Sequence, residues 1–457
     1  MSSLSACDAC FKRKRKCDFG SDWTQCVNCQ ASSLQCTRTR PQRRTGRPPN
    51  AGPAGKQGVF DIWESNHGME RARVTQPSSS RSRLTPNGEL VRTSNSRDCQ
   101  RLPDMEDENI YAALDIWMFG STFAHDFYRA IHYCYRNSPW LLHEMFIAMD
   151  TFLDWARFNR TTSERVDIER GARSLQKLRT AEVAGPQDAL AILMLGQALA
   201  AFDAFMTSTG AISILRYSLS LVGPWYSGFA QVQFLDPVTI SPIFWDIAGC
   251  LVYRELPVIR PILRDPPVVD RLAGLCTSLL PVLYDLCVVG HDMRKDPTQV
   301  RRLDGLEERI RHWNPDTNNL QSLGFSTIEI ASMRTQAVMY RPASLLLIHR
   351  LRYPLSCHDE TAVSLANEIM DGRTAFFANH GNEATLQNVG LPTFLALLEV
   401  PLPADGFWKS STRLRVRPAC VDTLISFHRH LWEQKLSGFS GSLFELVDSG
   451  PKFVPLP

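Results

Sequence analysis

The chain has 457 residues and a hydrophobic fraction of 44%, so it is long enough for two or more regions and apolar enough to bury a large core. Its charge is unevenly distributed: residues 1–102 hold 18 Lys and Arg against 8 Asp and Glu, whereas residues 103–457 hold 32 against 39. A basic arm on an acidic body indicates a polyanionic partner for the arm.

Secreted and membrane-spanning proteins are disfavoured by two features. Residues 1–6 contain no apolar signal segment, so we expect reduced or metal-bound cysteines rather than disulfides. The longest apolar stretch, residues 189–202, has about 14 residues and includes Gln197, whereas a membrane span needs roughly 20. We therefore expect an intracellular protein with a buried apolar helix and no membrane partner.

Six of the 13 cysteines lie in the first 36 residues and form a repeated pattern. The unit C-x2-C-x6-C occurs twice, offset by 19 residues, and a C-x2-C pair places two sulfurs close enough to bind one metal ion. The six-residue insert of the first unit carries five consecutive cations at residues 12–16, whereas that of the second unit is neutral. The six cysteines are Cys7, Cys10, Cys17, Cys26, Cys29 and Cys36.

The number of available ligands predicts two zinc ions per chain. Three thiolates in each half leave a tetrahedral Zn²⁺ one ligand short, so six sulfurs complete two ions only if two sulfurs bridge them. Residues 1–36 carry few large apolar side chains and should fold only with metal. A disulfide knot and a zinc module without nucleic-acid binding are the alternatives. The missing signal segment disfavours the first, and the cations of a single insert disfavour the second.

The sequence Cys-Asp-Ala-Cys-Phe-Lys-Arg-Lys-Arg-Lys-Cys-Asp, followed by Cys26-Val-Asn-Cys29, resembles the fungal binuclear zinc cluster (Zn2Cys6) transcription factors. All six cysteines fit the family pattern. One departure is Thr24, which stands where the family usually has a proline, two residues before the fourth cysteine. The resemblance implies that Cys7 and Cys26 are the bridging ligands.

The resemblance also implies a mode of DNA binding. The basic turn after the second cysteine enters the major groove, and the lysine that usually reads a CGG triplet matches Lys14, with Arg13 beside it. Lysine and arginine donate well to the O6 and N7 atoms of guanine. The cationic run at residues 12–16 is also a candidate nuclear-import signal, so we expect a nuclear protein. The remaining cations, which we expect to contact phosphates and set the register, are Lys12, Arg15 and Lys16.

Residues 37–105 carry few large apolar side chains and predict a disordered basic linker. Within it, Gly46-Arg47-Pro48 is similar to a minor-groove arm of the AT-hook type, although Thr45 replaces the usual arginine. An extended linker that follows the phosphate backbone is the favoured interpretation. Its expected phosphate contacts are Arg43, Arg44 and Arg47.

The same segment lacks the heptad-repeat helix through which many members of the family dimerise. No run of three heptads with apolar a and d positions occurs between the cysteines and residue 105. Binding as a monomer and dimerisation through the C-terminal region, which would make the chain a homodimer, both stay open.

From residue 106 to residue 457 the sequence predicts a mainly α-helical domain. Apolar side chains recur at three- to four-residue steps, and breaks such as Gly223-Pro224 and Asn314-Pro315 separate the helices. Residues 188–202 and 345–354 resemble helices of the regulatory domain of many of these factors, which implies sensing of a ligand or co-repressor. The predicted helices cover residues 141–158, 163–180, 186–206, 209–222, 269–290, 327–351, 361–380 and 420–436.

No catalytic motif is found in this domain, which contains no HExxH, GxSxG, P-loop or GxGxxG sequence in its proper context. His428, His430 and the pair Cys357-His358 are isolated near predicted helices. We therefore expect no enzymatic activity, and an enzyme fused to a zinc module is disfavoured.

Together these features predict a nuclear transcription factor that recognises CGG-type half-sites on double-stranded DNA. We expect a pathway-specific activator of RNA polymerase II genes, such as a metabolic or secondary-metabolite gene cluster, that acts with the transcription machinery or co-regulators. A repressor of the same class and a non-specific chromatin-binding zinc module are the alternatives. The expected architecture is a small metal-folded binuclear zinc cluster in residues 1–36, a disordered basic linker in residues 37–105 and a large mainly α-helical domain in residues 106–457.

Overall fold

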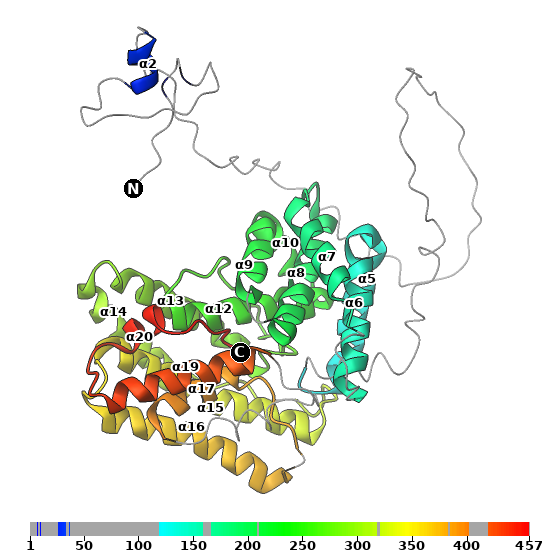
Figure 1. The fold of residues 1–457 in the computed structure, drawn as a ribbon. Helices are drawn as coiled ribbons and strands as arrows, with labels where there is room; N and C mark the ends of the chain where they lie inside the picture. Colours follow the sequence, from blue (N-terminus) through cyan, green and yellow to red (C-terminus); the bar gives the residue numbers. More distant parts are fainter. Residues whose placement is uncertain are drawn as a thin grey trace, which may run out of the picture. The chain divides into compact units, whose positions relative to one another are not determined.

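The computed structural model describes two parts of the chain. Near the N-terminus it covers Cys7, Cys10, residues 26–32 and Cys36, and further on it covers residues 118–158, 166–207, 210–317, 320–382, 384–401 and 419–456. The chain divides into two compact units, Met1–Leu90 and Val91–Pro457. The helix described in full in the first unit is α2, Val27–Ala31, drawn in blue in Figure 1. The predicted linker lies outside the described residues.

All named elements in the described part of the second unit are helices (Figure 1). The one other regular pairing there is an isolated antiparallel bridge between Asp270 and Gly274. The prediction of a mainly α-helical domain is therefore confirmed. The α-helices are α5 (Ala124–Asn137), α6 (Pro139–Phe158), α7 (Ile168–Thr180), α8 (Pro186–Met206), α9 (Ala211–Val222), α10 (Tyr226–Phe229), α11 (Asp236–Thr239), α12 (Ser241–Tyr253), α13 (Leu280–Met293), α14 (Arg302–His312), α15 (Thr327–Arg352), α16 (Asp359–His380), α17 (Gly390–Glu399), α19 (Ala419–Leu436) and α20 (Leu443–Ser449). Short 3₁₀ turns are η5 (Ser121–Phe123), η7 (Gly223–Trp225), η8 (Gln233–Leu235), η9 (Leu275–Ser278) and η10 (Pro297–Arg301).

Local capping explains where two of the long helices begin. The Ser326 side chain accepts from the Glu329 N–H and the Glu329 side chain accepts from the Ser326 N–H, so a capping box starts α15 at Thr327 as predicted. The Asp167 side chain accepts from the Arg170 N–H and starts α7 at Ile168, five residues after the predicted start.

The prediction of one helix over residues 269–290 is wrong in its first half. Asp270 accepts hydrogen bonds from the Leu272 and Ala273 N–H groups, which folds the backbone into a turn. Gly274 follows with a φ of 52°, a left-handed conformation that ends any helix at this point. A 3₁₀ turn comes next, and the α-helix α13 begins only at Leu280.

The apolar helix α8 lies in the core of the second unit. The 14-residue stretch predicted to be a buried helix falls within it, and most of its side chains are buried. The Gln197 side chain donates to the Val238 carbonyl over 2.7 Å and accepts from Arg271 over 3.2 Å, so a polar group is accommodated in this apolar environment. Two helical stretches, Pro186–Met206 and Gln233–Tyr253, are long and apolar enough to cross a membrane, but 78% and 94% of their most apolar windows are buried inside the protein. This is the environment of core helices.

A buried ion network joins four helices of the C-terminal part (α15, α16, α17 and α19; Figure 1). The Arg350 guanidinium donates to both oxygens of Glu399 over 2.7 Å each and to Asp359 over 2.7 Å. Lys435 donates to the same Glu399 carboxylate over 3.0 Å. The side chains of Arg350 and Glu399 are 0% and 2% exposed, so water does not solvate their charges. Each charge is instead stabilised by its ion-pair partners.

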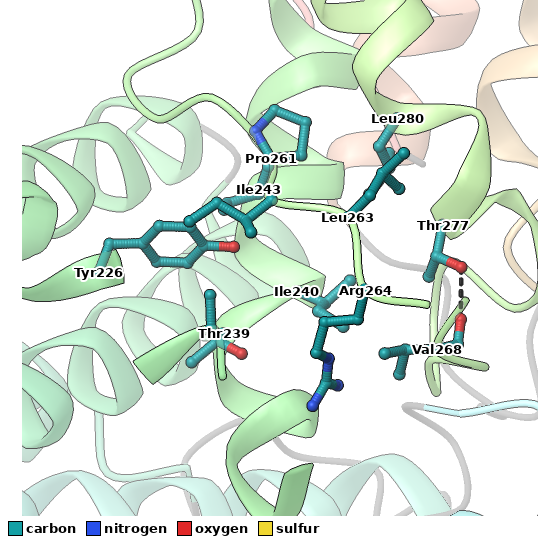
Figure 2. Close-up of a pocket in the computed structure, with 12 residues that line it drawn as sticks. Tyr226, Thr239, Ile240, Ile243, Pro261, Leu263, Arg264, Val268, Thr277 and Leu280 are labelled. Carbon is teal, nitrogen blue, oxygen red and sulfur yellow. Dashed lines mark hydrogen bonds between the residues drawn. The ribbon is translucent and has the colours of Figure 1, made fainter. Parts of the chain in front are cut away.

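A small cavity lies between α12 and the helix-free segment that follows it (Figure 2). Helix α12 ends at Arg254, whose φ of 51° is left-handed, and no helix follows until η9 begins at Leu275. Residues 261–264 of this segment form one wall of the cavity.

Replacing Gly196 with alanine is expected to lower the free energy of unfolding of the helical unit by about 2 kcal/mol, because it overpacks a close contact between α8 and α9. A Cβ atom at position 196 would lie 2.1 Å from the Oγ and 2.3 Å from the Cβ of the buried Ser218. Urea unfolding of the full chain, followed by circular dichroism at 222 nm, measures the change.

The matched control is Gly249→Ala in α12, where the nearest atom to a new Cβ is the Ile212 Cδ1 at 3.5 Å, an ordinary van der Waals distance. This substitution should leave stability unchanged or raise it by up to about 1 kcal/mol through helix propensity. Equal destabilisation by both substitutions would show that the close helix contact does not determine the result.

Candidate metal centre

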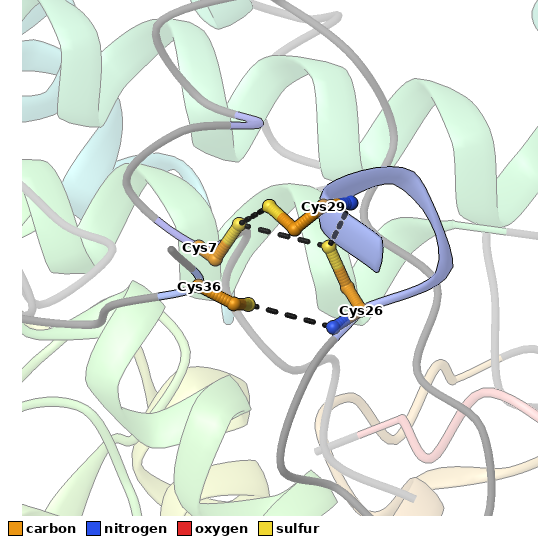
Figure 3. A group of neighbouring side chains, drawn as sticks. All are labelled: Cys7, Cys26, Cys29 and Cys36. Atoms are coloured by element: carbon orange, nitrogen blue, oxygen red, sulfur yellow. Dashed lines mark hydrogen bonds between the residues drawn. The ribbon is translucent and has the colours of Figure 1, made fainter. Parts of the chain in front are cut away.

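Cysteine sulfurs from both sequence repeats gather at one place in the first unit (Figure 3). Cys26 stands directly before the one-turn helix α2, and its side chain accepts from the Cys29 N–H over 3.4 Å. The equivalent contact recurs in the first repeat, where the Cys10 N–H donates to the Cys7 sulfur over 3.4 Å. The shared C-x2-C sequence thus produces the same local geometry twice.

The contacts between the two repeats follow the same symmetry. The Cys7 sulfur lies 3.5 Å from that of Cys29, and the Cys26 sulfur lies 3.5 Å from that of Cys10. The first cysteines of the two repeats, Cys7 and Cys26, are 3.8 Å apart. Each of these two sulfurs therefore contacts the second cysteine of the other repeat as well as its own counterpart.

These distances fit zinc thiolate coordination. Zn–S bonds of about 2.3 Å in a tetrahedron place the sulfurs about 3.8 Å apart, whereas a disulfide requires about 2.05 Å. Four sulfurs, those of Cys7, Cys26, Cys29 and Cys36, lie within 4.8 Å of one another, and all four cysteines are free. The set could hold one zinc ion, with Cys7 and Cys26 placed where they could also serve a second ion beside Cys10.

The close packing of the sulfurs changes their ionisation. Burial raises the pKa of the Cys7 thiol, but the Cys10 N–H and the sulfur of Cys29 lower it by more, so that it falls to about 6. The pKa of Cys29 rises, through burial first and then through the sulfurs of Cys7 and Cys26. Because zinc binds thiolates, metal binding to such a set displaces protons.

The remaining predicted site residues lie outside the described residues. These are the sixth cysteine, the cations of the basic run and the linker arginines, namely Cys17, Lys12, Arg13, Lys14, Arg15, Lys16, Arg43, Arg44 and Arg47. The structure therefore brings together five of the six predicted metal ligands and does not test the DNA contacts.

Two histidines of the second unit, one of them the isolated His428, bond to backbone carbonyls. The Nε2 atom of His428 lies 2.7 Å from the Leu397 carbonyl oxygen, and His349 makes a 3.1 Å hydrogen bond with the His358 carbonyl. Within the part of the chain that the structure describes, the cysteine cluster is the one group of three or more His, Cys, Asp or Glu side chains that could hold a metal ion.

Comparison with protein families supports this metal centre. The profile described as the fungal Zn(2)-Cys(6) binuclear cluster domain matches residues 5–45, which include all six cysteines and the basic run. The comparisons with curated proteins and with solved structures give no match. The match and the cysteine cluster identify residues 5–45 as a fungal Zn(2)-Cys(6) binuclear cluster domain, a domain of fungal DNA-binding transcription factors.

Proposed function

We propose that residues 1–36 bind two zinc ions and read CGG-type half-sites in double-stranded DNA. The observation that carries this proposal is the meeting of both cysteine repeats at one centre, with Cys7 and Cys26 between the two halves. Cys7 and Cys26 bridge the ions, Cys29 and Cys36 complete one of them, and Cys10 and Cys17 complete the other. The zinc supplies folding free energy rather than reaction chemistry.

The basic run forms the DNA-reading surface of this proposal. Lys14, with Arg13 beside it, donates to the O6 and N7 atoms of guanine in the major groove. The neighbouring cations and the basic linker neutralise phosphates and fix the register without reading sequence. These phosphate contacts are Lys12, Arg15, Lys16, Arg43, Arg44 and Arg47.

The larger region, residues 106–457, acts as a regulatory domain attached through the linker of residues 37–105. Its role is to recruit co-regulators or transcription machinery at RNA polymerase II promoters of one pathway, such as a metabolic or secondary-metabolite gene cluster. Nuclear location is typical of the family, and the basic run supports import. The net acidic charge of this region argues against direct DNA binding by the body itself. Activation of these genes is the favoured role, and repression by the same DNA-binding mode is the second candidate. A homodimer, if one forms, would form through residues 106–457.

Replacing Lys14 with alanine is expected to reduce discrimination between a CGG half-site and a scrambled site about 10- to 100-fold, since a good contact to guanine contributes about 1–3 kcal/mol of specificity. Fluorescence anisotropy with both DNA duplexes measures the ratio of dissociation constants at a fixed salt concentration. Arg43→Ala is the matched control, because loss of a phosphate contact weakens both duplexes equally and reduces the salt slope by about 1. A uniform loss of affinity for both duplexes in Lys14→Ala would refute the base-reading role and favour a non-specific chromatin module.

A further inference from the structure

Residues 451–456 follow helix α20 as a segment without regular secondary structure that contacts α12, α17 and α19 (Figure 1). Phe453 of this segment is 4% exposed. Its ring centroid lies 4.5 Å from that of Phe427 in α19 and 4.8 Å from that of Phe394 in α17. The ring centroid of Tyr253 in α12 is 5.5 Å away. The segment thus places one aromatic side chain among aromatic side chains of three helices.

Side chains of α12 and α19 also hold the backbone of this segment. The Tyr253 hydroxyl donates to the Phe453 carbonyl over 2.6 Å and accepts from the Phe453 N–H over 3.2 Å. The Trp245 indole N–H donates to the Pro455 carbonyl over 3.0 Å. The Thr423 hydroxyl accepts from the next N–H of the segment over 3.4 Å. Within the described chain the segment makes no main-chain to main-chain hydrogen bond with any helix, so it can be exchanged without breaking a helical hydrogen bond.

The connection between α20 and this segment is exposed and can act as a hinge. Residues 448, 449, 451 and 452 are exposed, and Gly450, which ends α20 with an extended backbone, is half-buried. Lys452 donates to the Val447 and Asp448 carbonyls over 3.4 and 3.2 Å. Polar contacts of such an exposed side chain contribute little to stability. The connection can therefore change direction without moving a buried side chain.

The helices that receive the segment need an occupant. Without it, buried aromatic and other apolar side chains would face water, which is unfavourable. Residues 451–456 of a second copy meet this need, because they present the same groups in the same order. Exchange of an identical element between two copies is a low-cost route to a dimer. We call the receiving side chains the segment-binding surface, which consists of Trp245, Tyr253, Phe394, Thr423 and Phe427.

Charge and sequence agree with a second copy as the occupant. The buried residues of the segment, Phe453, Val454 and Pro455, are uncharged, so two exchanged segments do not repel each other. The chain also has no run of three heptads with apolar a and d positions between the cysteines and residue 105. A dimer contact therefore has to come from elsewhere in the chain.

We propose that two copies of the chain exchange residues 451–456 and form a homodimer in which Phe453 of each copy packs against Phe394 and Phe427 of the other. Each copy thereby supplies the segment that completes the segment-binding surface of its partner. The exchange places two zinc clusters on one particle, so that two half-sites can be bound together. It supplies the contact for the homodimer that the proposed function leaves open. Because it is tested without DNA, its failure leaves the DNA-reading proposal intact.

A photoreactive side chain in the segment distinguishes exchange from packing within one chain. The full zinc-loaded chain, with p-benzoylphenylalanine in place of the half-buried Leu456, should sediment as a dimer. After irradiation, denaturing electrophoresis should show a band at twice the mass of the chain, with the crosslink mapped by mass spectrometry to α12 or α19. The same photoreactive residue in place of Leu436, which is 85% exposed at the end of α19, is the control and should give no such band.

Adding Phe453→Ala to the photoreactive chain should lower the yield of the double-mass band at least about five-fold, because it removes the buried anchor of the segment. Phe376→Ala is the matched control, since Phe376 is 3% exposed but lies in α16, outside the segment-binding surface. It should preserve the yield, and circular dichroism at 222 nm verifies that both variants are folded. A monomer at every concentration tested, crosslinks confined to the band of single mass, or an equal loss of the dimer band in Phe376→Ala would overturn the proposal.

Discussion

Replacing Cys26 with serine is expected to remove both zinc ions, whereas replacing Cys36 is expected to remove only one. The Cys26 sulfur lies 3.5 Å from Cys10 and 3.8 Å from Cys7, between the two halves of the cluster. As a bridging ligand it would belong to both coordination spheres. Cys36 contacts the Cys26 N–H over 3.4 Å and belongs to one group of four sulfurs, so its loss leaves the ligands of the other ion in place.

The expected zinc content, measured by inductively coupled plasma mass spectrometry, is two ions per chain in the unmodified protein, about one in Cys36→Ser and close to none in Cys26→Ser. DNA affinity should fall by at least about 100-fold in Cys26→Ser, since a cluster without metal does not fold. Cys134→Ser, which replaces a buried thiol of α5, is the control and should keep both ions. Loss of one ion in both cluster variants would exclude Cys26 as a bridge.

The metal centre is the part of this protein that the sequence predicts best. Ligand spacing is a local property, and two identical C-x2-C turns were sufficient to predict that the sulfurs of both repeats meet. The described cysteines do so, with matching distances of 3.5 Å on the two sides of the Cys7–Cys26 contact. What the spacing alone left open was which sulfurs are shared, and the central position of Cys7 and Cys26 now supports the choice that the family resemblance implied.

Helices with a long apolar stretch or a clear cap could also be predicted. The helix expected over residues 327–351 is found as Thr327–Arg352, and that expected over residues 186–206 is found as Pro186–Met206. Helix α14 was not predicted, although its buried residues Leu303, Leu306 and Ile310 have helical spacing that could have indicated it.

Other helices lack a periodic signal for a physical reason. In α17 every residue from Gly390 to Glu399 is buried, so no polar face alternates with an apolar one. Helix α12 is likewise buried along almost its entire length.

Ion pairs between residues far apart in the chain cannot be predicted from the sequence either, and the Arg350 network is the main example. Its members come from α15, α16, α17 and α19, and the two most buried ones are 49 residues apart. Burial lowers the pKa of the Arg350 guanidinium, but Glu399 and Asp359 raise it by more, so the residue stays charged. The network therefore holds a permanent charge inside the C-terminal part of the fold.

Replacing Arg350 with methionine is expected to lower the free energy of unfolding by about 3 kcal/mol, because among the described residues the buried Glu399 carboxylate then keeps only Lys435 as a cationic partner. Arg302→Met is the matched control, since Arg302 forms a 2.7 Å pair with Asp292 in which both side chains are more than 40% exposed. The control should change stability by less than about 1 kcal/mol. Urea unfolding of the full chain, monitored at 222 nm, compares the two.

A double variant separates the buried charge from simple loss of packing. Combining Arg350→Met with Glu399→Leu removes the uncompensated carboxylate and should recover most of the stability lost in Arg350→Met, because a buried ion pair replaced by apolar side chains is often neutral or stabilising. Lys435 tolerates this change, since it also donates to the Leu398 carbonyl over 2.6 Å. If the double variant is less stable than Arg350→Met, the network contributes through the packing of its side chains rather than through charge. If Arg350→Met lowers the free energy of unfolding no more than Arg302→Met does, burial of the Arg350–Glu399 pair has no effect on stability. The four helices would then be held together by their apolar contacts alone.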